Sequence, residues 1–434
     1  MEDKINSELV DVFLYEYQFA DWDEINEDIL KDEDTPSEIL DILYEGNAAD
    51  IRVLRGIAIH PNASSELLKK LSENQNDVVR WGVAENHRTP EKVLIKLSND
   101  SSDVIRYRIA LNPHTPEAVL SSLLKEDSKI VRSGVAANVN ATPEMLEELS
   151  RDEKRTVRLA VAENENTKAE ILAVLAEDED RNVRAAVAEN KNASPEILTK
   201  LASDERTLVR EKVAGNENIP LVVFQKLKGD MQTVVRNSLA SNKKAPVELL
   251  SELANDQKQS VRAGVAGNVN SSEQILRHLS DDIDAYVRKA VAGNINTPAR
   301  VLTRLSKDDD WRVCEKIAGN PNTPDEVLEY LSNYRDTYVR KAVASNSSTP
   351  KDVLERLAED GEWLVRENVA KNVNAPSEAL MKMKEDEDLR VTRLVIKNRN
   401  MTKDDLMYLS VSRNFRLRFK ACVQLLKINC EDSL

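Results

Sequence analysis

Apolar side chains recur along the chain with the spacing of short amphipathic helices. In residues 77–102, Val79 and Val83 are four residues apart, and Leu94 and Leu97 are three residues apart. Either spacing places both side chains on one face of an α-helix. A run of polar residues separates the two pairs. The segment therefore predicts two short helices, each with one apolar face.

This pattern repeats every 26 residues without an insertion. A Val-Arg pair, or a close variant, marks each unit, and its second residue is Leu54, Arg80, Arg106, Arg132, Arg158, Arg184, Arg210, Arg236, Arg262, Arg288, Cys314, Arg340, Arg366, Thr392 and Arg418. Tandem repeats of this kind form solenoids, in which each unit packs against its neighbours. We predict an all-α protein, a right-handed α-solenoid of about 15 tandem 26-residue two-helix repeats.

Two columns of apolar residues indicate how the units pack. An alanine column runs from Ala84 to Ala370, and a leucine column runs from Leu97 to Leu357. Small alanine side chains allow neighbouring helices to approach closely, while leucine fills the space between helix layers. We expect helices of about 8 to 11 residues, which are too short to be stable alone in water. Stability must therefore come from stacking.

The turns between helices also carry constant residues. Asn86 recurs at 13 equivalent positions up to Asn398, which predicts a left-handed conformation after each first helix. The triplet Thr89-Pro90-Glu91 predicts the start of the second helix, with the threonine hydroxyl as its cap. The same Thr-Pro device recurs at Thr297-Pro298, Thr323-Pro324 and Thr349-Pro350.

The charges divide the chain into three parts. Residues 1–50 hold 17 acidic and 2 basic side chains, whereas residues 387–434 hold 10 basic and 6 acidic ones. Aromatic residues accompany the first group, namely Phe13, Tyr15, Tyr17, Phe19 and Trp22. We predict an N-terminal cap over residues 1–50 with a degenerate repeat at Thr35-Pro36, a solenoid over residues 51–410 and a capping helix over residues 411–434.

Composition argues against several classes of protein. No stretch approaches the roughly 18 apolar residues of a membrane span, and the acidic start does not resemble a signal peptide, so we expect a cytoplasmic protein. The three cysteines are too scattered for a disulfide framework or a zinc site. His60, His87 and His114 lie on successive turns, where a spacing of about 9–10 Å between packed helices is too wide for shared metal ligands. We predict no cofactor and no metal.

The repeat V-R-x-x-V-A-x-N-x-N-x-T-P-x-x-L-x-x-L-x-x-D resembles the leucine-rich repeat variant family and, more broadly, HEAT-like repeats. The resemblance implies that the column aspartates link successive units through a side-chain ladder; they are Asp100, Asp152, Asp178, Asp204, Asp230, Asp256, Asp282 and Asp360. These units differ from that family in having room for two α-helices. The iron–sulfur version of the family carries a cysteine cluster before its repeats, and here no cysteine precedes Cys314.

Binding surfaces of solenoids are formed by the positions that vary. Two or three residues before the column arginine, four consecutive units carry Tyr286, Trp311, Tyr338 and Trp363. Basic residues accompany them, namely Arg312, Lys316, Arg335 and Lys341. Cys314 and Tyr334 interrupt the ladder there, which suggests a local bend or a binding feature. The aromatics form either a partner-binding ridge or packing against the preceding turn.

The sequence holds no Ser/His/Asp arrangement, phosphate-binding loop or His-Glu-x-x-His segment, so we predict that the protein is not an enzyme. The leading hypothesis is a protein–protein interaction scaffold that binds a protein or peptide, with an acidic or extended segment favoured. We predict partner contacts at Tyr286, Trp311, Arg312, Lys316, Tyr338, Lys341 and Trp363. The alternatives are a nucleic-acid-binding HEAT-like protein and an enzyme on a HEAT-like scaffold, glycosylase-like or lyase-like.

Overall fold

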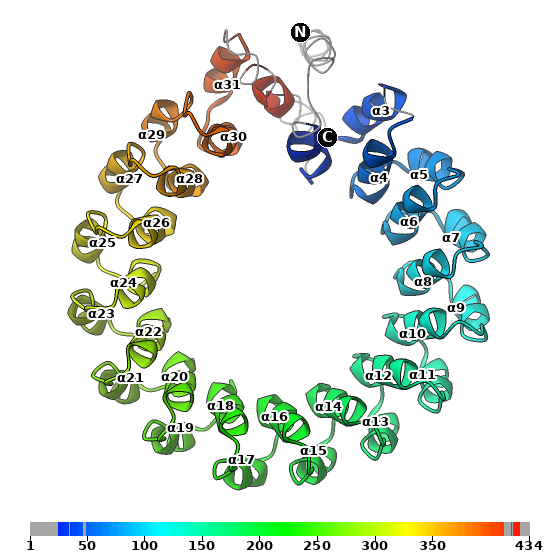
Figure 1. The fold of residues 1–434 in the computed structure, drawn as a ribbon. Coiled ribbons are helices and arrows are strands. Elements are labelled where there is room, and N and C mark those ends of the chain that lie inside the picture. The colour runs from blue at the N-terminus through cyan, green and yellow to red at the C-terminus, as the bar shows by residue number, and fades with distance from the viewer. Residues whose placement is uncertain (1–24, 34, 47–48, 412–417, 419, 426–434) are drawn as a thin grey trace. The chain divides into compact units, whose positions relative to one another are not determined.

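The computed structural model describes residues 25–411 except residues 34 and 47–48, together with residue 418 and residues 420–425. Every regular element in this part of the chain is a helix. The chain divides into two compact units, Ala20–Leu227 and Lys228–Leu434. Each is a tandem array of short helices (Figure 1).

In the unit Ala20–Leu227, each repeat supplies an even-numbered helix followed by an odd-numbered one. The even-numbered helices are α4 (Ile51–Ile59), α6 (Asp77–Glu85), α8 (Asp103–Leu111), α10 (Lys129–Ala137), α12 (Arg155–Glu163), α14 (Arg181–Glu189) and α16 (Thr207–Gly215). The others are α3 (Ser37–Gly46), α5 (Ser65–Leu71), α7 (Glu91–Leu97), α9 (Glu117–Leu123), α11 (Pro143–Leu149), α13 (Ala169–Leu175), α15 (Pro195–Leu201) and α17 (Leu221–Leu227), with a π-helical turn, η1 (Asn26–Leu30), before them.

The unit Lys228–Leu434 continues the same alternation. Its even-numbered helices are α18 (Thr233–Ser241), α20 (Gln259–Gly267), α22 (Ala285–Gly293), α24 (Trp311–Ala318), α26 (Thr337–Ser345), α28 (Trp363–Lys371) and α30 (Leu389–Lys397). Its odd-numbered helices are α19 (Val247–Leu253), α21 (Glu273–Leu279), α23 (Ala299–Leu305), α25 (Asp325–Leu331), α27 (Lys351–Leu357), α29 (Ser377–Lys382) and α31 (Lys403–Ser410).

The two rows of helices pack differently. Within each unit, consecutive even-numbered helices contact one another extensively, whereas odd-numbered helices contact mainly their neighbours in sequence. The tightly packed even-numbered row therefore lies on the inner side of the curve in each unit (Figure 1). This arrangement confirms the predicted all-α solenoid of tandem two-helix repeats. Its handedness and the total number of repeats stay predictions, as do the boundaries at residues 50 and 410.

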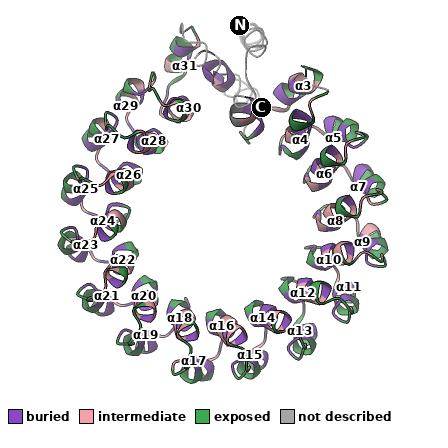
Figure 2. Ribbon diagram, viewed as in Figure 1, coloured by how far each residue is buried: buried purple, intermediate pink, exposed green. Residues whose placement is uncertain are grey.

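The predicted apolar columns form the core. Residues of the alanine column are at most 1% exposed and residues of the leucine column at most 5% exposed. Buried positions recur in helix after helix (Figure 2). The first helix of a typical repeat has nine residues, as in α6, and the second has seven, as in α7. The second helices are thus shorter than expected, and their stability depends even more on their neighbours.

The prediction of a left-handed conformation at the asparagine column is wrong. Asn86 has φ −67° and ψ 127°, which is extended backbone, and no described residue has a positive φ. The side chain accounts for the column instead. Nδ2 of Asn86 donates to the carbonyls of Ala58 and His60 in the preceding repeat, at 2.8 and 2.9 Å, and Oδ1 accepts from the amide of Arg88. A buried amide ladder therefore joins successive repeats.

The predicted role of the threonine in the Thr-Pro turns is also wrong. The Thr89 hydroxyl donates to the carbonyl of Val83 at 2.5 Å, while Pro90 occupies the N-cap position without a side-chain bond. The hydroxyl thus satisfies a carbonyl at the end of the first helix, where orphan acceptors remain. Thr35 makes the equivalent bond to Ile29 in the predicted degenerate repeat. Where the threonine comes one residue later, as at Thr142, it does cap the second helix.

The ion-pair ladder implied by the family resemblance is present. Nε of Arg80 lies 2.8 Å from Asp100 of the next repeat. The carbonyl of Asp100 in turn accepts from Arg106 at 2.7 Å. Equivalent pairs are Arg132–Asp152, Arg158–Asp178, Arg184–Asp204, Arg236–Asp256, Arg262–Asp282, Arg288–Asp308, Arg340–Asp360 and Arg366–Asp386. Most of these aspartates therefore connect two arginines, one through the carboxylate and one through the backbone carbonyl, whereas the carbonyls of Asp308 and Asp386 accept from Cys314 and Thr392 instead.

The ladder makes stability depend on pH. Burial opposes ionisation of its aspartates, but hydrogen bonds from the paired arginine and a backbone amide outweigh burial and lower the pKa of Asp100, Asp152, Asp204, Asp256, Asp282 and Asp308. Unfolded aspartate titrates near pH 3.9. The stabilisation is therefore present above that pKa and is lost as the pH falls through the folded-state values.

We expect the free energy of unfolding, measured by urea denaturation with circular dichroism, to fall steeply below about pH 4. An Asp204→Asn variant removes one titrating group and should show a shallower fall, by up to about 1.4 kcal/mol per pH unit. An unfolding free energy that stays constant from about pH 5 to about pH 3 would contradict this account.

Both ends of the chain include predictions that lie outside the described residues. These are the aromatic N-terminal cap at Phe13, Tyr15, Tyr17, Phe19 and Trp22 and most of the capping segment over residues 411–434. Of the latter, Lys420 to Leu425 are helical, and Ala421 and Cys422 are buried.

Candidate partner-binding surface

The inner surface of the unit Lys228–Leu434 is formed by one face of its even-numbered helices. In α22, the core face consists of Val287, Val291 and Ala292, which are fully buried. Tyr286 and Lys289 lie on the opposite, accessible face. The 26-residue period carries these two positions into every neighbouring helix. We call the surface formed by these faces of α18 to α28 the inner surface.

All seven predicted contact residues lie on four consecutive even-numbered helices, α22, α24, α26 and α28. The two tyrosines are exposed, Tyr286 by 54% and Tyr338 by 51%. Trp311 is half-buried and stacks on Tyr338, with ring centroids 5.7 Å apart and an angle of 26° between the planes. Such a stack stabilises by about 0.5–1.5 kcal/mol beyond the area it buries. The pair fixes an aromatic platform across α24 and α26.

Trp363 is placed differently from the other aromatics. It is half-buried, and the guanidinium carbon of Arg390 lies 3.4 Å from its ring centroid. Trp363 is therefore packed beneath an arginine of the next even-numbered helix. The packing alternative placed the aromatic rings against the preceding turn, whereas Trp363 contacts the following repeat and the two tyrosines are exposed.

Three lysines give this surface free positive charge. Lys289, Lys316 and Lys341 have no ion-pair partner within the described part of the chain. Arg312, by contrast, lies 3.4 Å from Asp310 and 5.5 Å from the Trp311 ring. Sequence reasoning missed Lys289, although it lies in the same column as Lys341.

A shallow depression of about 590 Å³ opens beside Tyr286, Lys289 and Lys316. The rest of its lining consists of small or amide residues of α18, α20 and α22, with Asn268 after α20, namely Asn237, Ser241, Ser260, Ala263, Gly264, Gly267, Asn268, Ala290 and Gly293. A Cβ atom at Gly264 would lie 2.8 Å from Oδ1 of Asn237 and 3.0 Å from Oγ of Ser241. Glycine at this position lets α18 and α20 pack closely. The floor of the depression is then formed by the polar side chains of Asn237 and Ser241.

The ladder changes at this surface. Cys314 replaces the column arginine, and Tyr334 replaces its aspartate partner. The thiol of Cys314 donates to the carbonyls of Ser306 and Asp308, both at 3.6 Å. Burial raises the pKa of Cys314, so the thiol stays neutral. Helix α24 ends one residue early, at Ala318, but Asn320 keeps its bonds to the preceding repeat.

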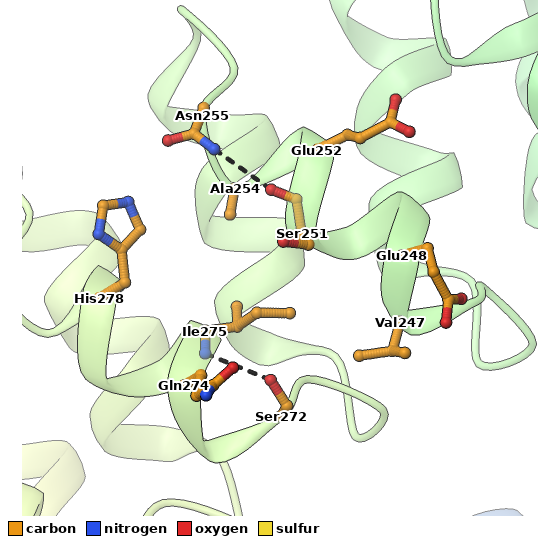
Figure 3. Close-up of a pocket in the computed structure, with 10 residues that line it drawn as sticks. All are labelled: Val247, Glu248, Ser251, Glu252, Ala254, Asn255, Ser272, Gln274, Ile275 and His278. Atoms are coloured by element: carbon orange, nitrogen blue, oxygen red, sulfur yellow. Dashed lines mark hydrogen bonds between the residues drawn. The ribbon is translucent and has the colours of Figure 1, made fainter.

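A second depression lies on the odd-numbered row, between α19 and α21 (Figure 3). His278 lines one end, while Glu248 and Glu252 extend away from it. Glu252 accepts a hydrogen bond from Lys228 at 2.7 Å. The imidazole and the carboxylates therefore do not converge on a common point, as general acid–base chemistry requires.

The three histidines of successive turns have separate surroundings. His60 is buried, with Nε2 2.9 Å from the carbonyl of Asp32 and Nδ1 accepting from the amide of Asn62. His87 and His114 are exposed. No cluster of three or more metal-ligating side chains occurs among the described residues.

No helix in the described part of the chain has the length and apolar character needed to cross a membrane.

Comparison with known proteins bears out the resemblance noted in the repeat. The model of the leucine-rich repeat variant family matches residues 181–206, which form the repeat of α14 and α15. No curated protein sequence matches.

Among solved structures, a leucine-rich repeat variant with a novel repetitive motif is 26% identical, with 51% of this chain and 87% of that chain covered at a TM-score of 0.36. Yeast importin-β (Kap95p) is 12% identical, with 89% of this chain and 60% of that chain covered, at a TM-score of 0.34. A structure of Kap95p binding to RanGDP is 11% identical, with 98% and 66% covered, at a TM-score of 0.31.

Proposed function

We propose that the protein is a non-catalytic scaffold that binds an extended, acidic segment of a partner protein on the inner surface between α18 and α28. The observation that carries this proposal is the combination of exposed tyrosines with lysines that lack an internal partner. Tyr286, Lys289 and Lys316 meet at the rim of one depression. Tyrosine supplies contact area at low entropic cost, and unpaired lysines attract carboxylates.

The floor of the depression favours an extended backbone as the occupant. Gly264, Gly267 and Gly293 present no side chain, so another main chain can approach closely. Asn237 and Ser241 provide donors and acceptors at the same floor. A peptide in extended form can place its backbone there and its acidic side chains toward the lysines.

Nucleic acid is the weaker candidate. Glu315 lies in the lysine column between Lys289 and Lys341, and the Arg312 guanidinium is already 3.4 Å from Asp310. A phosphate chain carries a charge at every nucleotide and needs a continuous basic track. Here a carboxylate interrupts that track.

Photo-cross-linking can test the proposal in cells. A benzophenone amino acid at position 286 is expected to capture a partner protein through an acidic peptide identified by mass spectrometry. Tyr330 on α25 is a matched control, because it is also 54% exposed but lies on the odd-numbered row. Capture of the same proteins from positions 286 and 330 would argue against the site.

Charge reversal then measures the contribution of the lysines. With the captured acidic peptide as probe, we expect Lys289→Glu/Lys316→Glu to weaken binding to the full-length protein by at least about tenfold, which is about 1.4 kcal/mol. Fluorescence anisotropy gives the affinities, and circular dichroism confirms that the variant is folded. Unchanged affinity would refute the role of this surface. A gel shift with single-stranded DNA at low salt, with a steep salt dependence, would favour the nucleic-acid alternative.

A further inference from the structure

A second aromatic and basic cluster lies in the other unit, Ala20–Leu227, and shares no residue with the surface described above. It centres on Trp81 of α6. The guanidinium carbons of Arg55, from α4, and Arg108, from α8, lie 5.2 and 4.8 Å from its ring centroid. Three consecutive even-numbered helices thus contribute to one cation–π cluster.

The two arginines differ in their remaining contacts. Arg108 lies 3.4 Å from Glu85 and is 31% exposed, so its charge is partly neutralised. Arg55 is exposed and has no ion-pair partner within the described residues. Trp81 orients this guanidinium without neutralising it, since the ring contributes only its quadrupole. Arg55 therefore presents a fixed, free positive charge.

The cavity beside this arginine is apolar. A depression of about 370 Å³ is lined by Arg55, Asp77, Val78, Trp81, Ser102, Val104 and Ile105. Val78 and Val104 are 43% and 47% exposed although they are large hydrophobic residues. Adjacent exposed apolar side chains around an indole favour burial by a partner.

We propose that this depression binds a large apolar side chain of an extended partner peptide, with a carboxylate next to it in the peptide paired to Arg55. Charge complementarity favours the second half of this assignment, because Arg55 at the rim is exposed and has no ion-pair partner within the described residues. The apolar walls determine the first half.

Nuclear magnetic resonance of the full-length protein can test the proposal, because the chain has four tryptophans and hence four indole N–H signals. A Trp81→Phe variant assigns the signal of Trp81. The probe is the peptide Gly-Ser-Asp-Asp-Phe-Asp-Asp-Ser-Gly, which we expect to shift the Trp81 signal. Two control peptides, one with serine for phenylalanine and one with lysine for every aspartate, should shift it far less.

Two variants then distinguish the loss of a specific contact with the Arg55 guanidinium from the general effect of reversing a surface charge. We expect Arg55→Glu to weaken the probe by about tenfold or more in the same titration. Arg181→Glu is the matched control, because Arg181 is an exposed residue at the start of α14, away from the depression. It should bind the probe as the parent does.

Several outcomes would overturn the proposal. These are no shift at Trp81, an equal shift with the lysine peptide, equal weakening by both arginine variants, or a larger shift with a twelve-nucleotide oligothymidine. Signals of Trp311 and Trp363 report separately on the inner surface of the other unit. The absence of a shift at Trp81 therefore does not contradict the function proposed for the inner surface. Likewise, a negative result at the inner surface does not contradict the present proposal.

Discussion

Replacing Asn190 by alanine is expected to lower the free energy of unfolding by about 3 kcal/mol, because two buried hydrogen bonds and one partly buried hydrogen bond are lost at about 1 kcal/mol or more each. Nδ2 of Asn190 donates to the carbonyls of Ala162 and Asn164 at 2.8 and 2.9 Å, and Oδ1 accepts from the amide of Asn192 at 2.8 Å. Asn190 itself is 7% exposed. The substitution removes one hydrogen bond from each partner group, although the carbonyl of Asn164 still accepts from the amide of Thr167, and water can reach the buried carbonyls only if the stack opens.

Asn192→Ala is the matched control for this prediction. Asn192 is the same residue type two positions later, and its Nδ2 also donates to the preceding repeat, to the carbonyls of Glu165 and Thr167. It is exposed, however, so water replaces the lost bonds and the expected loss is below about 1 kcal/mol. Urea unfolding followed by circular dichroism measures both variants. Hydrogen exchange should show the loss of protection concentrated in α12 to α15 for Asn190→Ala. Equal destabilisation by the two variants would refute the amide ladder as a main source of stability.

The asparagine column also illustrates what periodicity can predict. The 26-residue period identified the positions at which a residue type recurs, and the recurring apolar columns could be assigned to the core because burial is the usual role of an apolar side chain. A polar side chain has several possible partners. Asn86 bonds to Ala58 and His60, which are 28 and 26 residues away, and no pattern within one repeat reveals such partners. The local rules therefore predicted the wrong backbone conformation for asparagine and the wrong hydrogen bond for threonine.

The candidate surfaces were predictable to different degrees. Tyr286 and Tyr338 were selected as candidates because they depart from the residues usual in their column, and both are exposed. Trp81 lies in another column, one residue after the arginine, and so it was missed. Its significance depends on Arg55 and Arg108 of the neighbouring repeats. Reading every accessible column across neighbouring repeats would have found it.

The ion-pair ladder leads to the other large expected effect. Side chains of Arg184 and Asp204 are 15% and 8% exposed. Nη1 of Arg184 also donates to the carbonyl of Asp178 at 2.8 Å. Removing one member of a buried pair leaves an uncompensated charge, so Arg184→Met should cost about 3–5 kcal/mol in the free energy of unfolding. The pKa of Asp204, lowered by Arg184 despite burial, should rise in this variant.

Removing both members should cost much less, because well-packed apolar side chains often replace a buried ion pair at little loss. The chain itself contains positions of the ladder at which uncharged residues replace the ion pair. Cys314 and Tyr334 occupy the two positions of a single rung, and Leu54 and Asn74 occupy those of another. We therefore expect Arg184→Met/Asp204→Leu to recover at least half of the stability lost in Arg184→Met, as measured by urea unfolding at neutral pH. In a double-mutant cycle with Asp204→Leu, the coupling energy should be about 1–3 kcal/mol. If the double variant lost as much stability as the two single variants together, the arginine and the aspartate would act independently, and the ladder would not be a paired structure.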